Sequence, residues 1–295
     1  MRKRNWSKYN KDLVKRGSIT FFIDTDVLKQ KPEKNKRGRP RLFSHPIIQL
    51  LLILKVQYRL SYRALEGFSK SILPLLYLTV ALPTYSLICK RASKLEALLP
   101  KLSSRRPKVV LIDASGIKVY GEGEWKVKMH GKTKRRKWIK LHIAIDAKTQ
   151  EIIQLEVSHG HRADCRIGPR LIKKLPRSTK MVMGDGGYDT KQCREMIKEI
   201  GAEELIPPRK NGRLTKNLQR RNNAILEIKG LGGDQIAREI WGKLTGYSKR
   251  VLVETAFSRI KRLYGDRFYS KKSESQRTEG HIKCKMLNQM VSMTA

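Results

Sequence analysis

Acidic residues are scarce in this sequence. Its 295 residues include 26 Asp and Glu against 65 Lys and Arg, which gives a formal net charge of +39. Charge repulsion on that scale opposes compaction, so we expect a polyanionic partner to offset it. Nucleic acid is the first candidate, because each phosphate contact releases condensed counterions. The charge alone does not separate an enzyme from a structural nucleic-acid-binding protein.

Long apolar runs and clustered cysteines are also missing. The longest apolar stretch, Ile72 to Leu82, is about half as long as a membrane-crossing helix requires. The basic N-terminus lacks the apolar segment of a secretory signal. The four cysteines are widely separated and form no C-x-x-C pair, which argues against a zinc ribbon or a disulfide framework. We therefore expect a cytoplasmic protein.

The first hundred residues divide into two basic regions. Residues 1–42 carry 14 Lys or Arg and four acids, which predicts a basic tail. Near its end, Arg37 and Arg39 flank a glycine before a proline, a pattern typical either of a minor-groove contact or of a flexible linker. Residues 43–104 predict a helical DNA-binding region. Two helices there precede a basic one containing Lys90 and Arg91, an order typical of a helix-turn-helix reader or of a plain packing module.

Residues 105–290 predict an α/β domain. Strand patterns cover 109–120, 138–146, 151–157, 180–184 and 204–206, and helical patterns cover 167–175, 190–200 and 248–264. Residues 209–246 are basic and weakly patterned, which predicts an insertion. The order β-β-β-α-β-α-β, insertion, α predicts an RNase H-like fold, a mixed five-stranded sheet flanked by helices.

Two aspartates follow apolar strand segments. Asp113 ends the run Val-Val-Leu-Ile, and Asp185 comes directly after Met-Val-Met-Gly. A carboxylate there is unfavourable unless it serves a ligand or a hydrogen-bond network. Each aspartate alone could equally end a strand in a turn or cap a helix. Asp189 competes with Asp185, but its place before a helix favours capping, and Asp146 lies in an expected hairpin turn.

A third carboxylate belongs to a helical stripe. Tyr247, Arg250, Glu254 and Lys261 occupy positions i, i+3, i+7 and i+14, which fall within about 60° of one another on a helix. The opposite face is apolar, so we expect the helix to dock on the domain and direct the stripe. Such a stripe presents one carboxylate between cations. Glu227 and Glu239 could replace Glu254 only if this helix does not form.

The same residues resemble a known family. The spacing Tyr247-x2-Arg250-x3-Glu254-x6-Lys261 matches the Y-(2)-R-(3)-E-(6)-K signature of bacterial insertion-sequence DDE transposases. The segments 111–118 and 184–190 resemble the first- and second-aspartate motifs of that group. Segments 5–10, 16–18 and 37–40 are similar to the insertion sequence 5 family. The resemblance implies a transposase that binds terminal inverted repeats, cleaves DNA at the element's ends and joins the 3′ ends to target DNA.

The resemblance also implies roles for individual residues. Asp113, Asp185 and Glu254 would hold two Mg²⁺ ions, or Mn²⁺ in their place. Arg250 and Lys261 would contact phosphates of the transposon end, and Tyr247 would position the DNA. The implied partners are double-stranded DNA, at transposon ends and target, and a second copy of the chain, since pairing two ends requires at least a dimer. The implied location is the bacterial cytoplasm, at the nucleoid.

Other readings of the residues stay open. An RNase H-like nuclease would cleave without joining, and a transposase-derived DNA-binding protein would do neither. Trp138, beside a basic segment, could stack on an unpaired base or pack on the sheet. His159, His161, Asp164 and Cys165 have metal-binding side chains but no clear ligand spacing.

Overall fold

The computed structural model describes residues 5–18, 21, 42–76, 81–95, 99, 101–119 and 138–293. The chain forms two compact units, one of Met1–Pro100 with Arg262–Ala295 and the other of Lys101–Lys261. Helix α12 (Ser273–Met293) packs on α3 (His45–Gln57) and α5 (Tyr85–Ala92) of the first unit.

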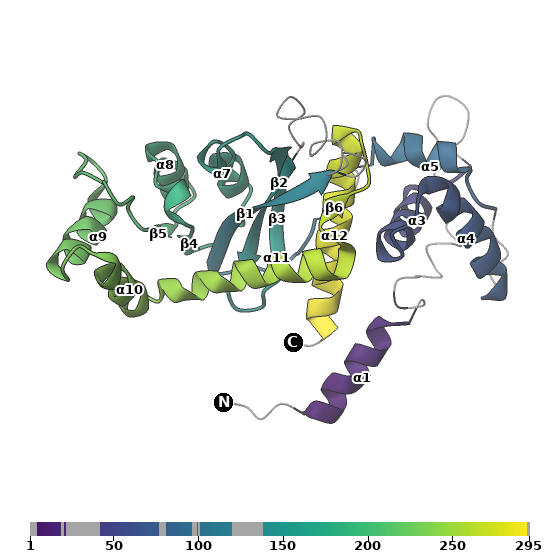
Figure 1. Ribbon diagram of the computed structural model, residues 1–295, viewed down its shortest axis with the longest axis horizontal. Coiled ribbons are helices and arrows are strands. Elements are labelled where there is room, and N and C mark those ends of the chain that lie inside the picture. Colours follow the sequence, from purple (N-terminus) through teal and green to yellow (C-terminus); the bar gives the residue numbers. More distant parts are fainter. Residues whose placement is uncertain are drawn as a thin grey trace, which may run out of the picture. The chain divides into compact units, whose positions relative to one another are not determined.

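A mixed sheet forms the centre of the second unit (Figure 1). Strands β1 (Val109–Val119), β2 (Trp138–Asp146) and β3 (Ile152–His159) pair antiparallel in succession. Strands β4 (Met181–Met183) and β5 (Glu203–Leu205) run parallel to β1, in the order β3-β2-β1-β4-β5. Three antiparallel strands followed by two parallel ones, with helices between, confirm the predicted RNase H-like α/β fold.

Asp146 closes the hairpin between β2 and β3. Its Oδ1 accepts a hydrogen bond from the backbone N–H of Lys148 at 3.0 Å, and its Oδ2 accepts one from the Thr149 hydroxyl at 2.9 Å. Gln150 completes the turn in the left-handed region, with φ of 62°. Both carboxylate oxygens of Asp146 therefore accept hydrogen bonds within the turn, and its place in a hairpin turn is as predicted.

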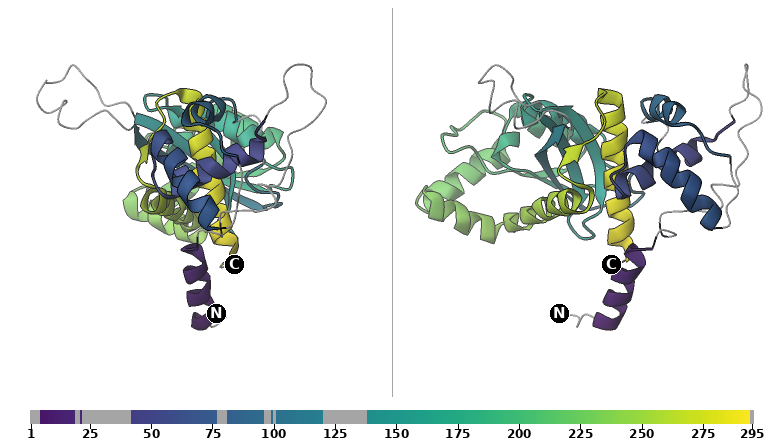
Figure 2. Two further views of the ribbon diagram at one scale, coloured as in Figure 1. Left: turned by 90° about the vertical axis from the view of Figure 1, so that its right-hand side faces the viewer. Right: turned by 45° about the vertical axis from the view of Figure 1, so that its right-hand side comes forward.

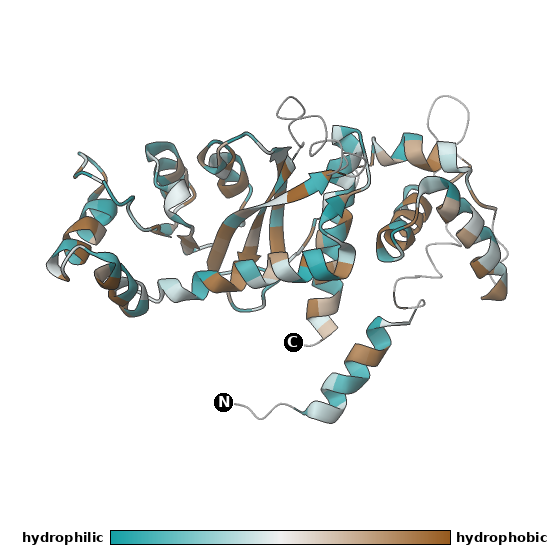
Figure 3. Cartoon of the chain, viewed as in Figure 1, coloured by the Kyte–Doolittle hydropathy of each residue, from teal (hydrophilic) through white to brown (hydrophobic). Residues whose placement is uncertain are grey.

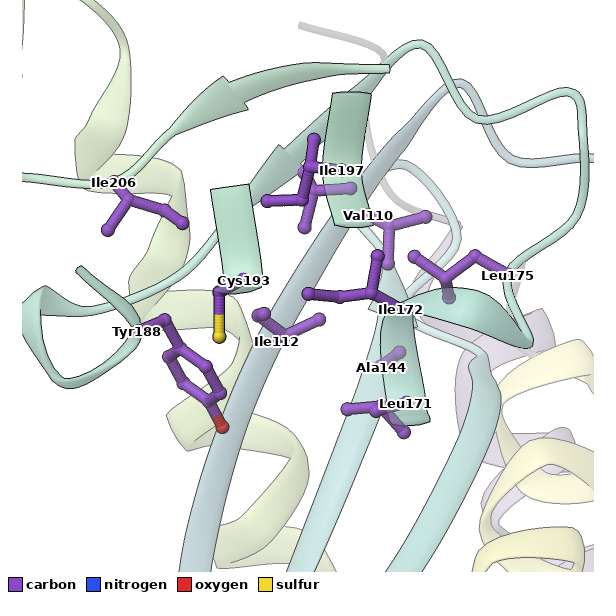
Figure 4. Close-up of a cluster of buried hydrophobic side chains, with 11 residues drawn as sticks. Val110, Ile112, Ala144, Leu171, Ile172, Leu175, Tyr188, Cys193, Ile197 and Ile206 are labelled. Atoms are coloured by element: carbon purple, nitrogen blue, oxygen red, sulfur yellow. The ribbon is translucent and has the colours of Figure 1, made fainter. Parts of the chain in front are cut away.

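Helices α7 (Asp164–Lys173) and α8 (Lys191–Glu199) cover one face of this sheet. Successive side chains of a strand point to opposite faces, so even-numbered residues of β1 meet these helices. Thr190 begins α8 as predicted, because its Oγ1 accepts the backbone N–H of Cys193. The resulting core is shown in Figure 4 and comprises Val110, Ile112, Ala144, Leu171, Ile172, Leu175, Val182, Tyr188, Cys193, Ile197 and Ile206.

The predicted insertion is a helical hairpin with its own small core. Helices α9 (Gln219–Gly230) and α10 (Gln235–Leu244) bury Ala224, Ile228, Ala237 and Trp241. They lie beyond the β5 edge of the sheet in Figures 1 and 2. The Trp241 indole N–H donates to Glu227 at 2.8 Å, and Glu239 accepts from Gln235 at 3.4 Å. Both glutamates therefore belong to the hairpin and do not replace Glu254.

The first unit contains four N-terminal helices, strand β6 (Arg267–Phe268) and α12 among its described elements. Helix α3 is hydrophobic along most of its length and largely buried (Figure 3). The predicted N-cap Ser61 begins α4 (Tyr62–Leu75), since its Oγ accepts the backbone N–H of Ala64 at 3.2 Å. No helix within the described ranges combines the length and apolarity needed to cross a membrane.

The predicted tail contains a helix, α1 (Trp6–Arg16). Asn5 caps it, because its Oδ1 accepts the backbone N–H of Lys8 at 3.0 Å. At its other end the Arg16 guanidinium donates to the carbonyl of Met290 at 2.9 Å. The early part of residues 1–42 is therefore helical, which corrects the prediction for that stretch. Arg37 and Arg39 lie outside the described residues.

Candidate active site

Asp113 lies on the central strand β1, which continues past it to Val119. Its side chain is 16% exposed, and its Oδ1 accepts the backbone N–H of Ala114 at 2.8 Å. Burial raises the pKa of Asp113, the Ala114 N–H and the Arg250 charge oppose that rise, and the negative charges of Asp185 and Glu254 add to it. The surrounding protein therefore does not fully stabilise the ionised carboxylate, so a bound cation would be favourable at this position.

Asp185 emerges beside Asp113 because β4 runs parallel to β1. Leu111 pairs with Met183; Asp113 lies two residues further along β1, and Asp185 lies two residues beyond the end of β4. Asp185 begins the short turn η4 (Gly186–Tyr188), and its Oδ1 accepts the backbone N–H of Gly187 at 2.9 Å. A Cβ at Gly187 would lie 2.9 Å from that same oxygen, so a larger residue there would displace the Asp185 carboxylate. Asp185 has no ion-pair partner among the residues that the structure describes.

Glu254 reaches the cluster from the first turn of α11 (Val251–Tyr264), with its side chain 53% exposed. Arg250 bridges two of the carboxylates: one guanidinium nitrogen donates to Asp113 Oδ2 at 3.1 Å and the other to Glu254 Oε1. Asp113 and Arg250 are 137 residues apart in sequence. Lys261 Nζ donates to Ser115 Oγ at 2.7 Å, two residues from Asp113. The stripe therefore faces β1.

Tyr247 lies before the helix rather than on it. Gly246 adopts a left-handed conformation with φ of 73°, and Tyr247–Arg250 form the 3₁₀ turn η5 before α11 begins at Val251. The predicted start near residue 248 is therefore slightly early. Burial raises the pKa of Tyr247 to about 12, and nearby carboxylates including Asp185 contribute to the rise. A neutral phenol thus lies beside the acidic cluster.

We had predicted that Asp189 caps helix α8. Thr190 caps the helix instead. The Asp189 carboxylate is 1% exposed and accepts hydrogen bonds from the Arg194 guanidinium at 2.9 and 3.0 Å. It also accepts from Arg221 Nε at 2.8 Å and from the backbone N–H of Arg209 at 3.0 Å. Asp189 is therefore the centre of a buried ion network. The sequence did not reveal this network, since its members come from separate elements.

The other predicted site residues have varied surroundings. Trp138 is 38% exposed at the start of β2, where its ring packs on Gly116. Lys90 is exposed on α5. Arg91, in contrast, donates to the carbonyl of Phe43 at 2.5 Å and hydrogen-bonds His45 Nδ1 at 3.0 Å, so its guanidinium serves packing within the first unit.

Across the described residues, no three His, Cys, Asp or Glu side chains are disposed as ligands of one metal ion. At the end of β3, His159 stacks on His161 with ring centroids 5.8 Å apart, while Asp164 at the start of α7 pairs with Lys140 at 2.9 Å. At the acidic cluster, the Arg250 guanidinium stands between Asp113 and Glu254. The donor set there nevertheless fits a divalent ion, because carboxylate oxygens suit Mg²⁺ and Mn²⁺.

Two protein families match this chain, and both are described as transposase DDE domains. One covers residues 104–289 and the other residues 14–122. An uncharacterised protein of Aquifex aeolicus (strain VF5) is 25% identical over 251 residues, which are 79% of this chain and 73% of that protein.

Solved structures of transposases also resemble the chain at low identity. The Drosophila P element transposase strand transfer complex has a TM-score of 0.34 and 14% identity, covering 95% of this chain and 70% of that one. The Mos1 mariner paired end complex with Mn has a TM-score of 0.25 and 11% identity, covering 99% and 88%. The family assignment rests on sequence: since one family match spans residues 104–289, well over half of the sequence, this chain belongs to the transposase DDE domain family.

Proposed function

We propose that this protein is a transposase of the insertion sequence 5 type. It binds the terminal inverted repeats of its element, cleaves the DNA at the ends and joins the 3′ ends to target DNA by metal-dependent phosphoryl transfer. The observation that carries the proposal is the bridge from Arg250 to Asp113 and Glu254. This bridge supports a shared site for carboxylates from β1 and α11, with Asp185 close enough to affect the pKa of Asp113.

The three carboxylates are the proposed catalytic and metal-binding residues. Two divalent ions, Mg²⁺ or Mn²⁺, would activate the attacking oxygen and stabilise the leaving one when bound. Until then Arg250 offsets the charge of Asp113 and Glu254. With the carboxylates engaged by metal, the Arg250 guanidinium would be available for a phosphate, to which it could donate two hydrogen bonds.

The neighbouring side chains suit DNA phosphates. Lys261 is held against Ser115, so its ammonium lies along β1 beside Asp113. The raised pKa of Tyr247 keeps its hydroxyl protonated, and the phenol can donate a hydrogen bond to a phosphate without adding negative charge. Trp138 at the start of β2 and Lys90 on α5 are further proposed contacts, together with Arg37 and Arg39.

Double-stranded DNA is the proposed partner, and the net charge of +39 supports it. We propose that residues 43–104 contribute to recognition of the transposon end, while the domain beginning near residue 105 carries out the chemistry. Pairing of two ends implies at least a dimer on DNA, at the bacterial nucleoid.

A labelled duplex that ends in the inverted repeats flanking the coding sequence tests the proposal. We expect Mg²⁺-dependent cleavage at the repeat and a joined product with target DNA, both lost in Glu254→Gln while end binding remains. Cleavage without a joined product would favour the RNase H-like nuclease. End binding without cleavage by the wild-type protein would overturn both enzyme readings and favour the non-catalytic DNA-binding protein.

A further inference from the structure

A basic pocket lies beside helix α7, on the face of the sheet opposite to α11. The cavity measures about 650 Å³ and is lined by His161, Arg162, Ala163, Arg166, Ile167 and Arg170. A cavity of this size accommodates a group as large as a nucleotide. None of the residues assigned to the acidic cluster lines it.

The three arginines of the pocket carry uncompensated charge. Their side chains are exposed, and none forms an ion pair or hydrogen bond with any residue that the structure describes. Asp164 is the nearest acid in sequence, but it already accepts a hydrogen bond from Lys140 Nζ at 2.9 Å. Three cations around a cavity without an acidic partner repel one another, so an anionic ligand would stabilise them.

The spacing of the arginines suits an extended anion better than a compact one. Arg166 and Arg170 lie one helical turn apart, about 6 Å along the axis, and Arg162 precedes the helix by two residues. Phosphates of one DNA strand recur about every 3.4 Å along the duplex. A row of three guanidinium groups can therefore reach successive phosphates, while the exposed Ala163 offers a small apolar surface to the sugars.

The position of the pocket is fixed by the end of β3. Gly160 follows that strand, and a Cβ added there would lie 2.6 Å from the Trp138 carbonyl oxygen. The chain therefore turns tightly against β2 before His161 and Arg162. The Lys140 ammonium also donates to the Arg162 carbonyl at 3.2 Å. Two contacts to β2 thus hold the entrance of the pocket to the sheet.

We propose that this α7 pocket binds the phosphodiester backbone of a DNA strand, as a second contact separate from the acidic cluster. The identity of the polyanion rests on the proposed function, whereas the site itself rests on the cavity and its three unpaired arginines. DNA that leaves the carboxylates would then be held on both faces of the sheet.

Arginine-selective modification of the full-length protein, read by mass spectrometry, tests the proposal without any substitution. The probe is a short mixed-sequence duplex in EDTA, so that no cleavage is needed. We expect Arg162, Arg166 and Arg170 to be protected at least about threefold by the duplex, as phosphate contacts exclude the reagent. Arg177 is the internal control, because it is exposed and has no ion-pair partner among the described residues; it should stay reactive.

A matched pair of triple variants supplies a second measurement. Arg162→Gln, Arg166→Gln and Arg170→Gln together should reduce the slope of log affinity against log salt by about 2 to 3, since each phosphate contact contributes about 0.9. The control triple, Lys148→Gln, Arg177→Gln and Lys198→Gln, removes the same charge elsewhere and should change the slope by less than about 1. Equal slopes in the two variants, or equal reactivity of all four arginines, would overturn the α7 pocket.

The outcome is independent of catalysis. Protection of the three arginines in a protein that never cleaves DNA would support the pocket and contradict the proposed function. Cleavage and joining by a protein whose three arginines stay unprotected would support the proposed function and contradict the pocket. Binding of inorganic phosphate but not of the duplex would also contradict a DNA backbone site.

Discussion

Asp185 and Asp189 lie four residues apart in one loop and have opposite surroundings. Asp185 accepts one backbone N–H from Gly187, and no described cation pairs with it. Asp189 is buried and surrounded by the guanidinium groups of Arg194 and Arg221. Burial alone would raise the pKa of Asp189, but the hydrogen bond from Arg221, the Arg209 N–H and the charge of Arg194 lower it instead.

The difference separates a structural carboxylate from one that is available to a ligand. The hydrogen-bonding capacity of Asp189 is satisfied within the protein, so it cannot bind metal without breaking its network. Asp185 keeps an oxygen free beside Asp113, whose own pKa is raised by burial. Residue type and sequence motif do not distinguish the two aspartates, but their partners do.

The largest expected effect comes from removing the free carboxylate. Asp185→Asn should lower the rate of DNA cleavage by more than about a thousandfold, because metal-ion catalysis supplies several kcal/mol of transition-state stabilisation. Its stability should change by less than about 0.5 kcal/mol, since the side chain makes one turn hydrogen bond that Asn can also accept. Single-turnover cleavage and urea unfolding check the two halves. A strongly destabilised variant would show that Asp185 is structural as well.

Removing the satisfied carboxylate should have the opposite consequence. Asp189→Asn removes the buried carboxylate that Arg194 and Arg221 share, and although Arg194 still pairs with Glu204, breaking a buried ion pair typically costs about 3 to 5 kcal/mol. The free energy of unfolding from urea titration should fall by that amount. Mn²⁺ affinity, measured on the fraction that remains folded, should stay within about threefold of wild type. Loss of Mn²⁺ binding without loss of stability would mean that Asp189, and not Asp185, is the metal-binding aspartate.

The sequence predicted the fold well where local pattern decides structure. The strand segments around Asp113 and Asp185 alternate or run apolar as buried strands do, and Thr190 and Ser61 are strong helix caps. Their elements formed close to the predicted bounds. Helix α12 was missed because it is buried on several sides and carries buried polar residues such as Lys283 and Glu279, so its periodicity is weak.

The sequence did not predict contacts between distant elements. Arg221 comes from the insertion and Arg194 from α8, and nothing in their spacing indicates that both bind Asp189. The Arg250 bridge to Asp113 was equally hidden, although the stripe that carries Arg250 was visible. The arginines of the α7 pocket recur every four residues, and that periodicity was a detectable signal.

His142 is a buried group whose charged form is positive, so it provides a second comparison with Asp189. It is fully buried on β2, where Nε2 hydrogen-bonds Ser158 at 2.8 Å and Nδ1 lies 3.9 Å from Asp164. Burial lowers the pKa of His142 from 6.5 to about 4, and the charge of Asp164 offsets this only in part. Unlike Asp189, this side chain has one distant counter-charge among the described residues, Asp164 at 3.9 Å, which does not offset the effect of burial.

The pH dependence of stability should reflect that burial. Above pH 6.5 the imidazole is neutral in both states and has no effect. As the pH falls from 6.5 towards 4, the unfolded chain gains the proton first, so stability falls by up to about 3 kcal/mol. Urea unfolding at several pH values should show a smaller decline in His142→Gln than in wild type. Identical declines would mean that His142 is protonated in the folded protein.

The smallest effect should come from one cation of the Asp189 network. Arg221→Gln removes the tie between α9 and the loop that carries both aspartates, while Arg194 still pairs with Asp189. Stability should therefore fall by about 1 to 2 kcal/mol, less than in Asp189→Asn. Arg220→Gln is the matched control, because the adjacent arginine pairs with Glu203 in an ion pair in which both side chains are more than half exposed, and such pairs contribute about 0 to 1 kcal/mol. Hydrogen exchange of α9 should accelerate only in Arg221→Gln, and equal acceleration in both variants would mean that the buried network does not hold the insertion.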